Sequence, residues 1–237
     1  MGYGDVSALN ENSKIKTTNI DRIANEGVIF TDAHSSSSVS TPSRYSVLTG
    51  RYNWRSDLKS GVLMGYNKAL IAPDRRTIAS VLRDQGYQTA CIGKWHLGWD
   101  WNNIEAGPDS VDFSKPISNG PTTRGFDYFY GIIASLDMAP YVYVENDMPT
   151  ALPDRVTVND GMKYWRKGPT ASDFDHEQTL PNFINRAVDY IHDKSKEDKP
   201  FYLYLPLPAP HTPILPIKEY QGKSGLNPYG DFVLMVD

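Results

Sequence analysis

Ser40 and Arg44 are the first pair of residues whose types and spacing could do chemistry. They begin and end the run Ser40-Thr41-Pro42-Ser43-Arg44. Pro42 suits the first turn of a helix and Gly50 suits the position just past its end, so Ser40 is predicted to lie at a helix N-terminus. Four residues make about one helical turn, which puts Arg44 on the face of Ser40. A helix N-terminus stabilises anions, and the arginine would add positive charge there.

Lys94 and His96 form a second pair, in the run Gly93-Lys94-Trp95-His96-Leu97-Gly98. If this segment is extended, residues two apart point to one side and Trp95 points to the other. Lysine binds anionic oxygens as a point charge, and histidine titrates close enough to neutral pH to move a proton. Taken alone, the pair could equally be a solvated lysine and a hydrogen-bonded loop histidine. Its interpretation therefore depends on Ser40 and Arg44.

His211 is the third candidate, in the run Pro208-Ala209-Pro210-His211-Thr212-Pro213. It follows a predicted strand, 201–205, and open α/β sheets bind ligands at the carboxyl ends of their strands. A histidine in a proline-stiffened loop can also be purely structural. The other histidines match no motif and are interpreted as residues of loops or of a solvated helix face: His34, His176 and His192.

Helices and strands alternate in the segments that carry these residues, which favours an α/β sheet. Capping residues, glycine stops and apolar spacing predict helices at 18–26, 41–49, 77–85 and 180–194, and apolar runs predict strands at 28–30, 87–92 and 201–205. On the longest helix the inward residues are predicted to be Phe183, Ile184, Ala187, Val188 and Ile191.

The segment 99–175 contains many Pro, Gly and Asp residues and only short strand candidates such as 128–130, so it is predicted to form elaborated loops that shape a cleft. Three tryptophans near its start could stack on a sugar or aryl group, or pack in the core: Trp95, Trp99 and Trp101. The single cysteine, Cys91, excludes an internal disulfide and is interpreted as a small buried apolar residue.

Size and composition indicate one large soluble domain. The 237 residues are 40% hydrophobic and 22% charged, with a net charge of -4, which gives no sign of a nucleic-acid-binding surface. No apolar run approaches the roughly 20 residues that span a bilayer. No signal peptide precedes Gly2, although one would be missed if the sequence began inside a longer protein.

The run from Ser40 to Arg51 resembles the signature of the sulfatase family: Cys or Ser, any residue, Pro, Ser, Arg, three residues, then Leu-Thr-Gly-Arg. The runs around Lys94 and His211 are similar to sulfatase sequence as well. The resemblance implies an alkaline phosphatase-like fold, in which helices flank a large, mostly parallel mixed sheet in three layers. It also implies a sulfuric ester hydrolase acting on sulfated small molecules or glycans.

The resemblance implies a role for each candidate residue. Ser40 would be oxidised to formylglycine, whose hydrate attacks the sulfate ester, and Arg44 would stabilise the hydrate. Lys94 would bind sulfate, His96 would remove the proton that triggers sulfate release, and His211 would contact sulfate and assist the leaving oxygen. Serine in place of cysteine implies a bacterial protein matured by an oxygen-independent radical enzyme, and the family implies a periplasmic or secreted location.

In sulfatases a divalent cation, usually calcium, is bound by an Asp-Asp pair early in the chain and an Asp-Asn or Asp-His pair later. The start of this sequence, Met1-Gly2-Tyr3-Gly4-Asp5, resembles the stretch after the first pair, and 227–237 resembles the helix before the second. Only Ser40, as formylglycine, matches a ligand position. We therefore expect residues 1–237 to be part of a sulfatase catalytic domain, incomplete at both ends and inactive alone.

Two alternatives remain open at this level. Related phosphodiesterases and phosphonate hydrolases share the sheet, and some use formylglycine. The chain could also bind sulfated glycans without cleaving them. Ser40 oxidation, detected by mass spectrometry, separates the second alternative from an enzyme.

Overall fold

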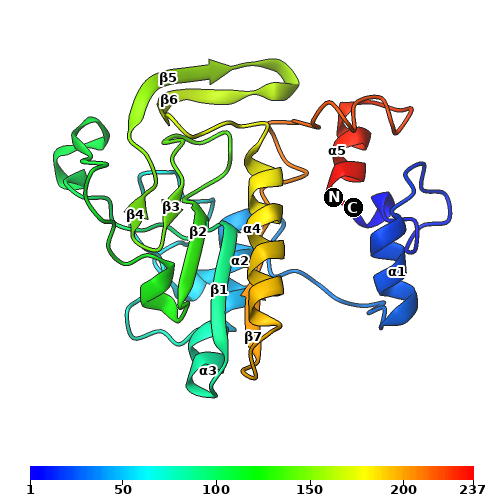
Figure 1. Ribbon diagram of the computed structural model, residues 1–237, viewed down its shortest axis with the longest axis horizontal. Helices are drawn as coiled ribbons and strands as arrows, with labels where there is room; N and C mark the ends of the chain where they lie inside the picture. The colour runs from blue at the N-terminus through cyan, green and yellow to red at the C-terminus, as the bar shows by residue number, and fades with distance from the viewer.

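The computed structural model describes residues 1–237 and has a five-stranded mixed sheet at its centre (Figure 1). The strands are β1 (Gln88–Lys94), β2 (Tyr128–Ile132), β3 (Val144–Glu145), β4 (Met148–Pro149) and β7 (Phe201–Tyr204), in the spatial order β4-β3-β2-β1-β7. β1 pairs in parallel with β2 and β7, and β3 is antiparallel to its neighbours. The α/β class and the mixed sheet are confirmed.

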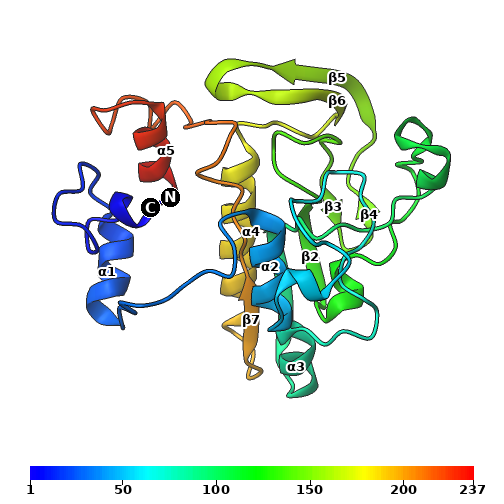
Figure 2. The ribbon, with the colours of Figure 1, turned by 180° about the vertical axis from the view of Figure 1, so that it is seen from behind.

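Helices cover both faces of this sheet and complete three layers. α4 (Thr179–Lys194) lies on the face turned to the viewer in Figure 1, and α2 (Ser40–Thr49) and α3 (Ile78–Asp84) lie on the opposite face, seen in Figure 2. One core cluster packs beneath α2 and α3 and includes Tyr45, Leu48, Ala79 and Cys91. A second cluster packs beneath α4. Burying side chains on both faces fixes the position of β1 between them.

Local signals determine the ends of α2 and α3 as predicted. Gly50 follows α2 with φ of 66°, a left-handed conformation that glycine adopts without steric cost. Thr77 precedes α3, and its hydroxyl accepts a hydrogen bond from the Ser80 amide. Apolar spacing predicts one inward face of α3 formed by Ile78, Val81 and Leu82, but Ile78 and Val81 are exposed and the buried residue is Ala79.

α4 begins and ends within a residue of the prediction, but its buried stripe is narrower than expected. Phe183 and Ala187 are buried against the sheet, whereas Ile184, Val188 and Ile191 are exposed. A helix lying on a sheet buries only the side chains directly beneath it. The flanking apolar residues therefore remain at the surface.

The segment 99–175 is more ordered than the predicted loops. It contains β2, β3 and β4 of the main sheet and a two-stranded antiparallel hairpin formed by β5 (Pro153–Asn159) and β6 (Trp165–Ala171). The strand candidate 128–130 is confirmed as part of β2, whereas β3 and β4 were not predicted because each has only two residues. Of the two readings of the tryptophans, core packing holds, since all three are buried: Trp95, Trp99 and Trp101.

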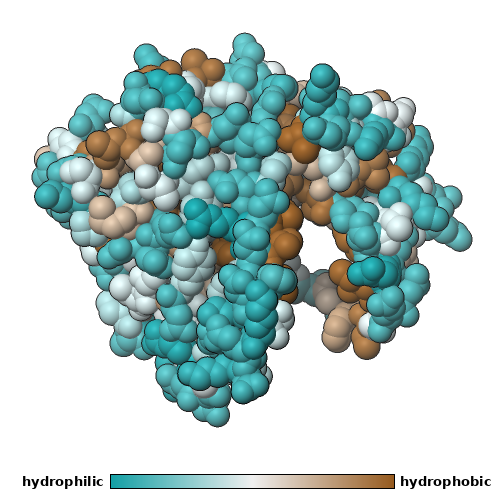
Figure 3. All heavy atoms as spheres, in the orientation of Figure 1, coloured by the Kyte–Doolittle hydropathy of each residue, from teal (hydrophilic) through white to brown (hydrophobic).

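α1 (Thr18–Glu26) and α5 (Pro228–Val236) form a small unit beside the sheet, and both chain ends lie there (Figure 1). The backbone amides of Asn19 and Ile20 donate to the Asp237 carboxylate, at 3.1 and 2.9 Å. Figure 3 shows an opening between this unit and the sheet, bordered by hydrophobic atoms. The predicted strand 28–30 is wrong, because Val28 and Phe30 are 76% and 77% exposed and pair with no strand.

None of the helices combines the length and apolar character that crossing a membrane requires. Cys91 is fully buried in β1, as predicted, and burial raises the pKa of its thiol.

Candidate active site

Ser40 is the first residue of α2, and its hydroxyl oxygen has two side-chain partners. Arg44 Nε donates to Ser40 Oγ at 2.7 Å, and His96 Nδ1 lies 2.8 Å from the same oxygen. The predicted sharing of a helix face by Ser40 and Arg44 is confirmed. Arg44 also donates through Nη1 to the backbone carbonyl of Lys94 at 2.7 Å. One guanidinium thus links the start of α2 to the end of β1.

His96 reaches Ser40 through a backbone conformation that differs from the prediction. The strand ends at Lys94, and His96 has φ of 56° in the left-handed region, so the segment is not extended through both residues. The His96 amide donates to the Ile133 carbonyl at 2.7 Å. The turn after β1 brings the imidazole of His96 against the N-terminus of α2.

The two nitrogens of the His96 ring have different partners, which determines its tautomer. Nε2 lies 2.8 Å from the Leu63 carbonyl oxygen, which can only accept, so Nε2 carries the hydrogen. Burial and the nearby Lys94 cation lower the pKa of His96 to about 3. The ring is therefore neutral at physiological pH, and the lone pair of Nδ1 faces Ser40 Oγ.

Lys94, the last residue of β1, is a buried cation without an ionic partner. Its side chain is 2% exposed, and Nζ donates to Ser135 Oγ at 2.6 Å. Burial and then the Arg44 charge lower the pKa of Lys94 to about 7. An anion bound beside Nζ would favour the charged form of the amine.

Ser135 is a site residue that the sequence did not reveal. It lies three residues after β2, and its hydroxyl is 3.4 Å from His211 Nδ1 as well as bonded to Lys94. No motif surrounds it. The only available signal was its place just beyond the carboxyl end of a strand, next to the carboxyl end of β1.

His211 is brought to the same place by the loop after β7. Its Nδ1 is 2.6 Å from the Thr212 carbonyl oxygen, so Nδ1 donates there and Nε2 is left to meet a ligand. Part of the residue is exposed to solvent, but its ring lies in the wall of a cavity, where desolvation and then the Lys94 charge lower its pKa. The three predicted groups therefore converge: Ser40 with Arg44, Lys94 with His96, and His211.

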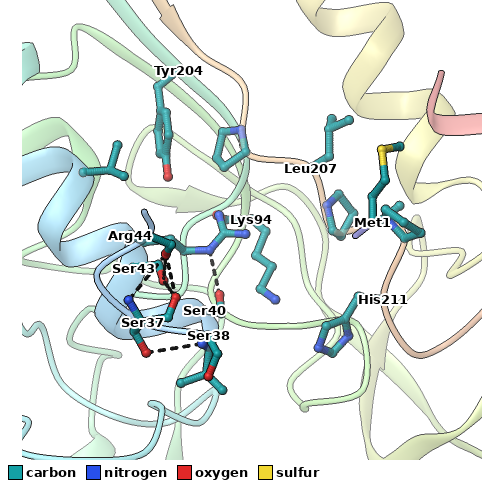
Figure 4. A pocket seen from close by; sticks show the side chains of 17 residues that line it. Met1, Ser37, Ser38, Ser40, Ser43, Arg44, Lys94, Tyr204, Leu207 and His211 are labelled. Carbon is teal, nitrogen blue, oxygen red and sulfur yellow. Dashed lines mark hydrogen bonds between the residues drawn. The ribbon is translucent and has the colours of Figure 1, made fainter. Parts of the chain in front are cut away.

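A cavity of about 500 Å³ opens over these side chains (Figure 4). Ser40, Arg44, Lys94 and His211 line it, whereas His96 lies behind Ser40 and does not. One further wall is hydroxylic, with Ser35, Ser37, Ser38 and Ser43, and another is the apolar loop 206–210. A guanidinium, a lysine whose charged form an anion would favour, and a hydroxyl bonded to a basic nitrogen together suit an anionic ester.

The remaining histidines lie away from this cavity. His34 and His192 are exposed, as interpreted from the sequence. His176 is not solvated. It is buried, its ring stacks on Trp165 with centroids 3.9 Å apart, and burial lowers its pKa to about 4. The aromatic residues around it come from distant segments, which sequence spacing could not show.

A divalent cation does not fit the residues present around Ser40. No group of three or more His, Cys, Asp and Glu side chains is arranged to bind a metal ion. Arg44, which is bonded to Ser40, is a cation that would repel one, and hard cations need about six oxygen ligands.

Comparison with known proteins gives concordant results. A family model described as Sulfatase matches residues 1–237. An N-acetylgalactosamine-6-O-sulfatase of Bacteroides thetaiotaomicron is 34% identical, with 100% of this chain and 51% of that protein aligned. Human arylsulfatase A is 30% identical, with 100% and 44% aligned. A solved structure of a sulfatase from a glycosaminoglycan-metabolising locus of Bacteroides thetaiotaomicron superposes with a TM-score of 0.85 at 32% identity, covering 99% of this chain and 54% of that one.

Proposed function

The chain belongs to the sulfatase family, and from that premise we propose that it carries the nucleophile and the sulfate-binding groups of a sulfuric ester hydrolase. One observation carries the proposal: Ser40 Oγ is held between Arg44 Nε and His96 Nδ1 at a helix N-terminus. A serine that only capped the helix would need neither partner. The chain spans about half the length of the curated relatives that it matches, so hydrolysis is proposed for the complete gene product.

Ser40 is the proposed precursor of formylglycine, made by an oxygen-independent radical maturase. An unmodified serine that attacked sulfur would leave a sulfate ester that water displaces slowly. Formylglycine, once hydrated, would supply one hydroxyl that attacks sulfur and displaces the alcohol, whose oxygen takes up a proton as the ester bond breaks. Deprotonation of the second hydroxyl would then regenerate the aldehyde as sulfate leaves by carbon–oxygen cleavage. The two partners of Ser40 Oγ suit such a group, since one donates to an oxygen and the other accepts its proton.

His96 is the proposed base at position 40. Its Nδ1 lone pair lies 2.8 Å from the oxygen, while Nε2–H is held by Leu63. Burial and the Lys94 charge disfavour the imidazolium that proton uptake by Nδ1 would make in the sulfate-free protein, and the negative charge of a bound sulfate would favour it. Arg44, fixed on the same oxygen, stabilises negative charge that develops there.

Lys94 and His211 are the proposed substrate-binding residues. The Lys94 ammonium is buried beside Arg44 and has no carboxylate in an ion pair, since Asp137, whose charge acts on it, is paired with Arg166. A sulfate group would supply negative charge in direct contact with Nζ. His211 presents Nε2 on the opposite side of the cavity, where it can contact the sulfate and assist the leaving oxygen. Carbohydrate and aryl sulfates are both candidate substrates, and the relative named for N-acetylgalactosamine 6-O-sulfate makes a sugar 6-sulfate the first to test.

Sulfatases generally use a divalent metal together with formylglycine. Because residues 1–237 by themselves do not fit a divalent cation, calcium is proposed only for a complete protein in which further oxygen ligands join Ser40, as formylglycine. No catalytic step above depends on the cation. A periplasmic or secreted location is likewise proposed from the family alone, and cell fractionation tests it.

The decisive experiment measures modification and hydrolysis on the complete gene product, expressed with a radical maturase. Mass spectrometry of the Ser40 peptide should show a loss of about two mass units, the change for serine oxidised to an aldehyde. Paired aryl esters should show faster hydrolysis of sulfate than of phosphate, and Ser40→Ala should abolish it. Ser46→Ala is the matched control, because Ser46 lies on the same helix and its hydroxyl bonds only to the Pro42 carbonyl.

The outcomes separate the alternatives. Faster cleavage of the phosphate or phosphonate ester would replace a sulfatase with a related formylglycine hydrolase. An unmodified Ser40 with retained binding of sulfated glycans and no turnover would favour a binding protein.

A further inference from the structure

Thr41, the residue after the proposed nucleophile, is fully buried in the first turn of α2 and does not line the cavity. Its hydroxyl makes two hydrogen bonds to backbone groups of distant segments. Thr41 Oγ1 donates to the His96 carbonyl at 3.0 Å and accepts from the Leu63 amide at 3.1 Å. The signature of the family leaves this position free, so the sequence pattern gives it no role.

Together with the ring of His96, these contacts complete a cycle of hydrogen bonds that links Thr41, Leu63 and His96. Leu63 donates its N–H to Thr41, and its carbonyl oxygen accepts from His96 Nε2. The His96 carbonyl in turn accepts from Thr41. The same hydroxyl therefore holds the backbone of His96 and the residue whose carbonyl selects its tautomer.

One hydrogen bond of this cycle also restrains the backbone conformation of His96. A histidine with φ of 56° lies in a sparsely populated region, which persists only where neighbouring contacts hold it. Thr41 and Ile133 bind the carbonyl and the amide of His96, one on each side of the residue. Without the Thr41 contact, one of these two restraints is lost.

We infer that Thr41 is a positioning residue that keeps His96 in the Nε2–H tautomer, with the Nδ1 lone pair on the oxygen of residue 40. This inference rests on the proposed function for its catalytic meaning. The geometry itself is independent of turnover. A purely structural threonine would stabilise the fold but leave the ring of His96 unaffected when replaced.

The test is nuclear magnetic resonance of the protein with 15N-labelled histidine, comparing wild type with Thr41→Val, Thr41→Ala and Thr41→Ser. Valine matches the shape of threonine without the hydroxyl, and serine keeps the hydroxyl. We expect the Nε2–H form of His96 in wild type and Thr41→Ser, and a mixture with Nδ1–H in Thr41→Val and Thr41→Ala. In the complete enzyme kcat should fall about tenfold in the valine variant, with KM little changed.

An Nδ1–H ring in wild type, or an unchanged Nε2–H ring in the valine and alanine variants, would overturn the inference. The wild-type spectrum decides the first point even if Thr41→Val does not fold. Thr41→Ala, which removes the hydroxyl together with a methyl group, gives a second variant for the second point. If the tautomer shifts as expected but no sulfate ester is cleaved, the proposed function fails and the positioning role stands. Normal hydrolysis by Thr41→Val with an unshifted ring would leave the function intact and remove the role of Thr41.

Discussion

The two sides of the cavity differ in how many of their polar groups already have hydrogen-bond or ionic partners. On the α2 side, Ser40 Oγ already has both a donor and an acceptor, and His96 is bonded at both ring nitrogens. On the β2 and β7 side, the Lys94 ammonium has one neutral partner, and Nε2 of the exposed His211 has none. The nucleophile side is complete in itself, whereas the anion side is short of negative charge.

This difference indicates a division of work. A preorganised nucleophile costs no rearrangement when the reaction begins. Cations that have no carboxylate partner are available for a substrate, because an anion there replaces no existing ion pair. Variants on the α2 side should therefore change turnover, and variants at Lys94 and Ser135 should change sulfate binding.

The largest effect is expected for His96→Ala in the complete enzyme. Loss of a general base should lower kcat by about 10²–10⁴-fold and leave the affinity for inorganic sulfate nearly unchanged. Steady-state kinetics and calorimetric titration measure the two quantities. His192→Ala is the control, because His192 is exposed at the end of α4. A comparable loss of sulfate affinity in His96→Ala would break the division between the two sides.

Lys94→Met should mainly weaken binding. The change keeps the length of the side chain and removes a buried charge, so inorganic sulfate should bind about 10–100-fold more weakly, as for loss of a charged hydrogen bond. Titration calorimetry measures this, with Lys196→Met, an exposed substitution, as the control. Wild-type sulfate affinity in Lys94→Met would show that the anion is held elsewhere.

Sulfate affinity should fall as pH rises past 7 in the wild-type protein. The pKa of Lys94 is lowered to about 7, so above that pH the sulfate-free amine is neutral, and binding must take up a proton. The decline is at most about tenfold per pH unit. Titrations from pH 6 to 9 would reveal it, and Lys94→Met should show a flatter profile. If sulfate affinity of the wild type depended on pH as little as that of Lys94→Met, Lys94 would not become neutral in this pH range and the prediction would be wrong.

The smallest effect is expected for Ser135→Ala. Removing the one hydrogen bond to Lys94 Nζ should weaken sulfate binding by about fivefold, corresponding to about 1 kcal/mol. The same titration measures it, with Ser60→Ala, at an exposed serine, as control. A change in kcat without a change in affinity would assign Ser135 to the other side of the cavity.

Local sequence rules predicted the parts of the site that local geometry determines. Proline, glycine and the spacing of four residues were sufficient to place Ser40 and Arg44 on one face of α2. The glycine-flanked run 93–98 contains the end of the core strand β1 at Lys94 and the turn that follows it at His96. These signals act within about one turn of helix or a few residues of strand.

Contacts between distant segments explain what could not be predicted. The left-handed turn at His96 depends on Thr41 and Ile133, which are far from it in the sequence. Ser135 becomes part of the site only because β2 lies beside β1. The apolar residues 28–30 predicted a strand, but pairing, which they lack, is decided by neighbours that no local pattern reveals.

The guanidinium of Arg44 makes the chemistry at residue 40 depend on the relative position of α2 and β1. Nε donates to Ser40 Oγ on the helix and Nη1 donates to the Lys94 carbonyl oxygen on the strand, each at 2.7 Å. A shift of the helix by about 1 Å along the sheet would break one of these hydrogen bonds, and misplacement of that size can cost about 100-fold in rate. Lysine has a single charged nitrogen and cannot span both oxygens. Both hydrogen bonds of Arg44 can therefore form only while α2 and β1 keep their relative position, and reaction at residue 40 depends on that alignment.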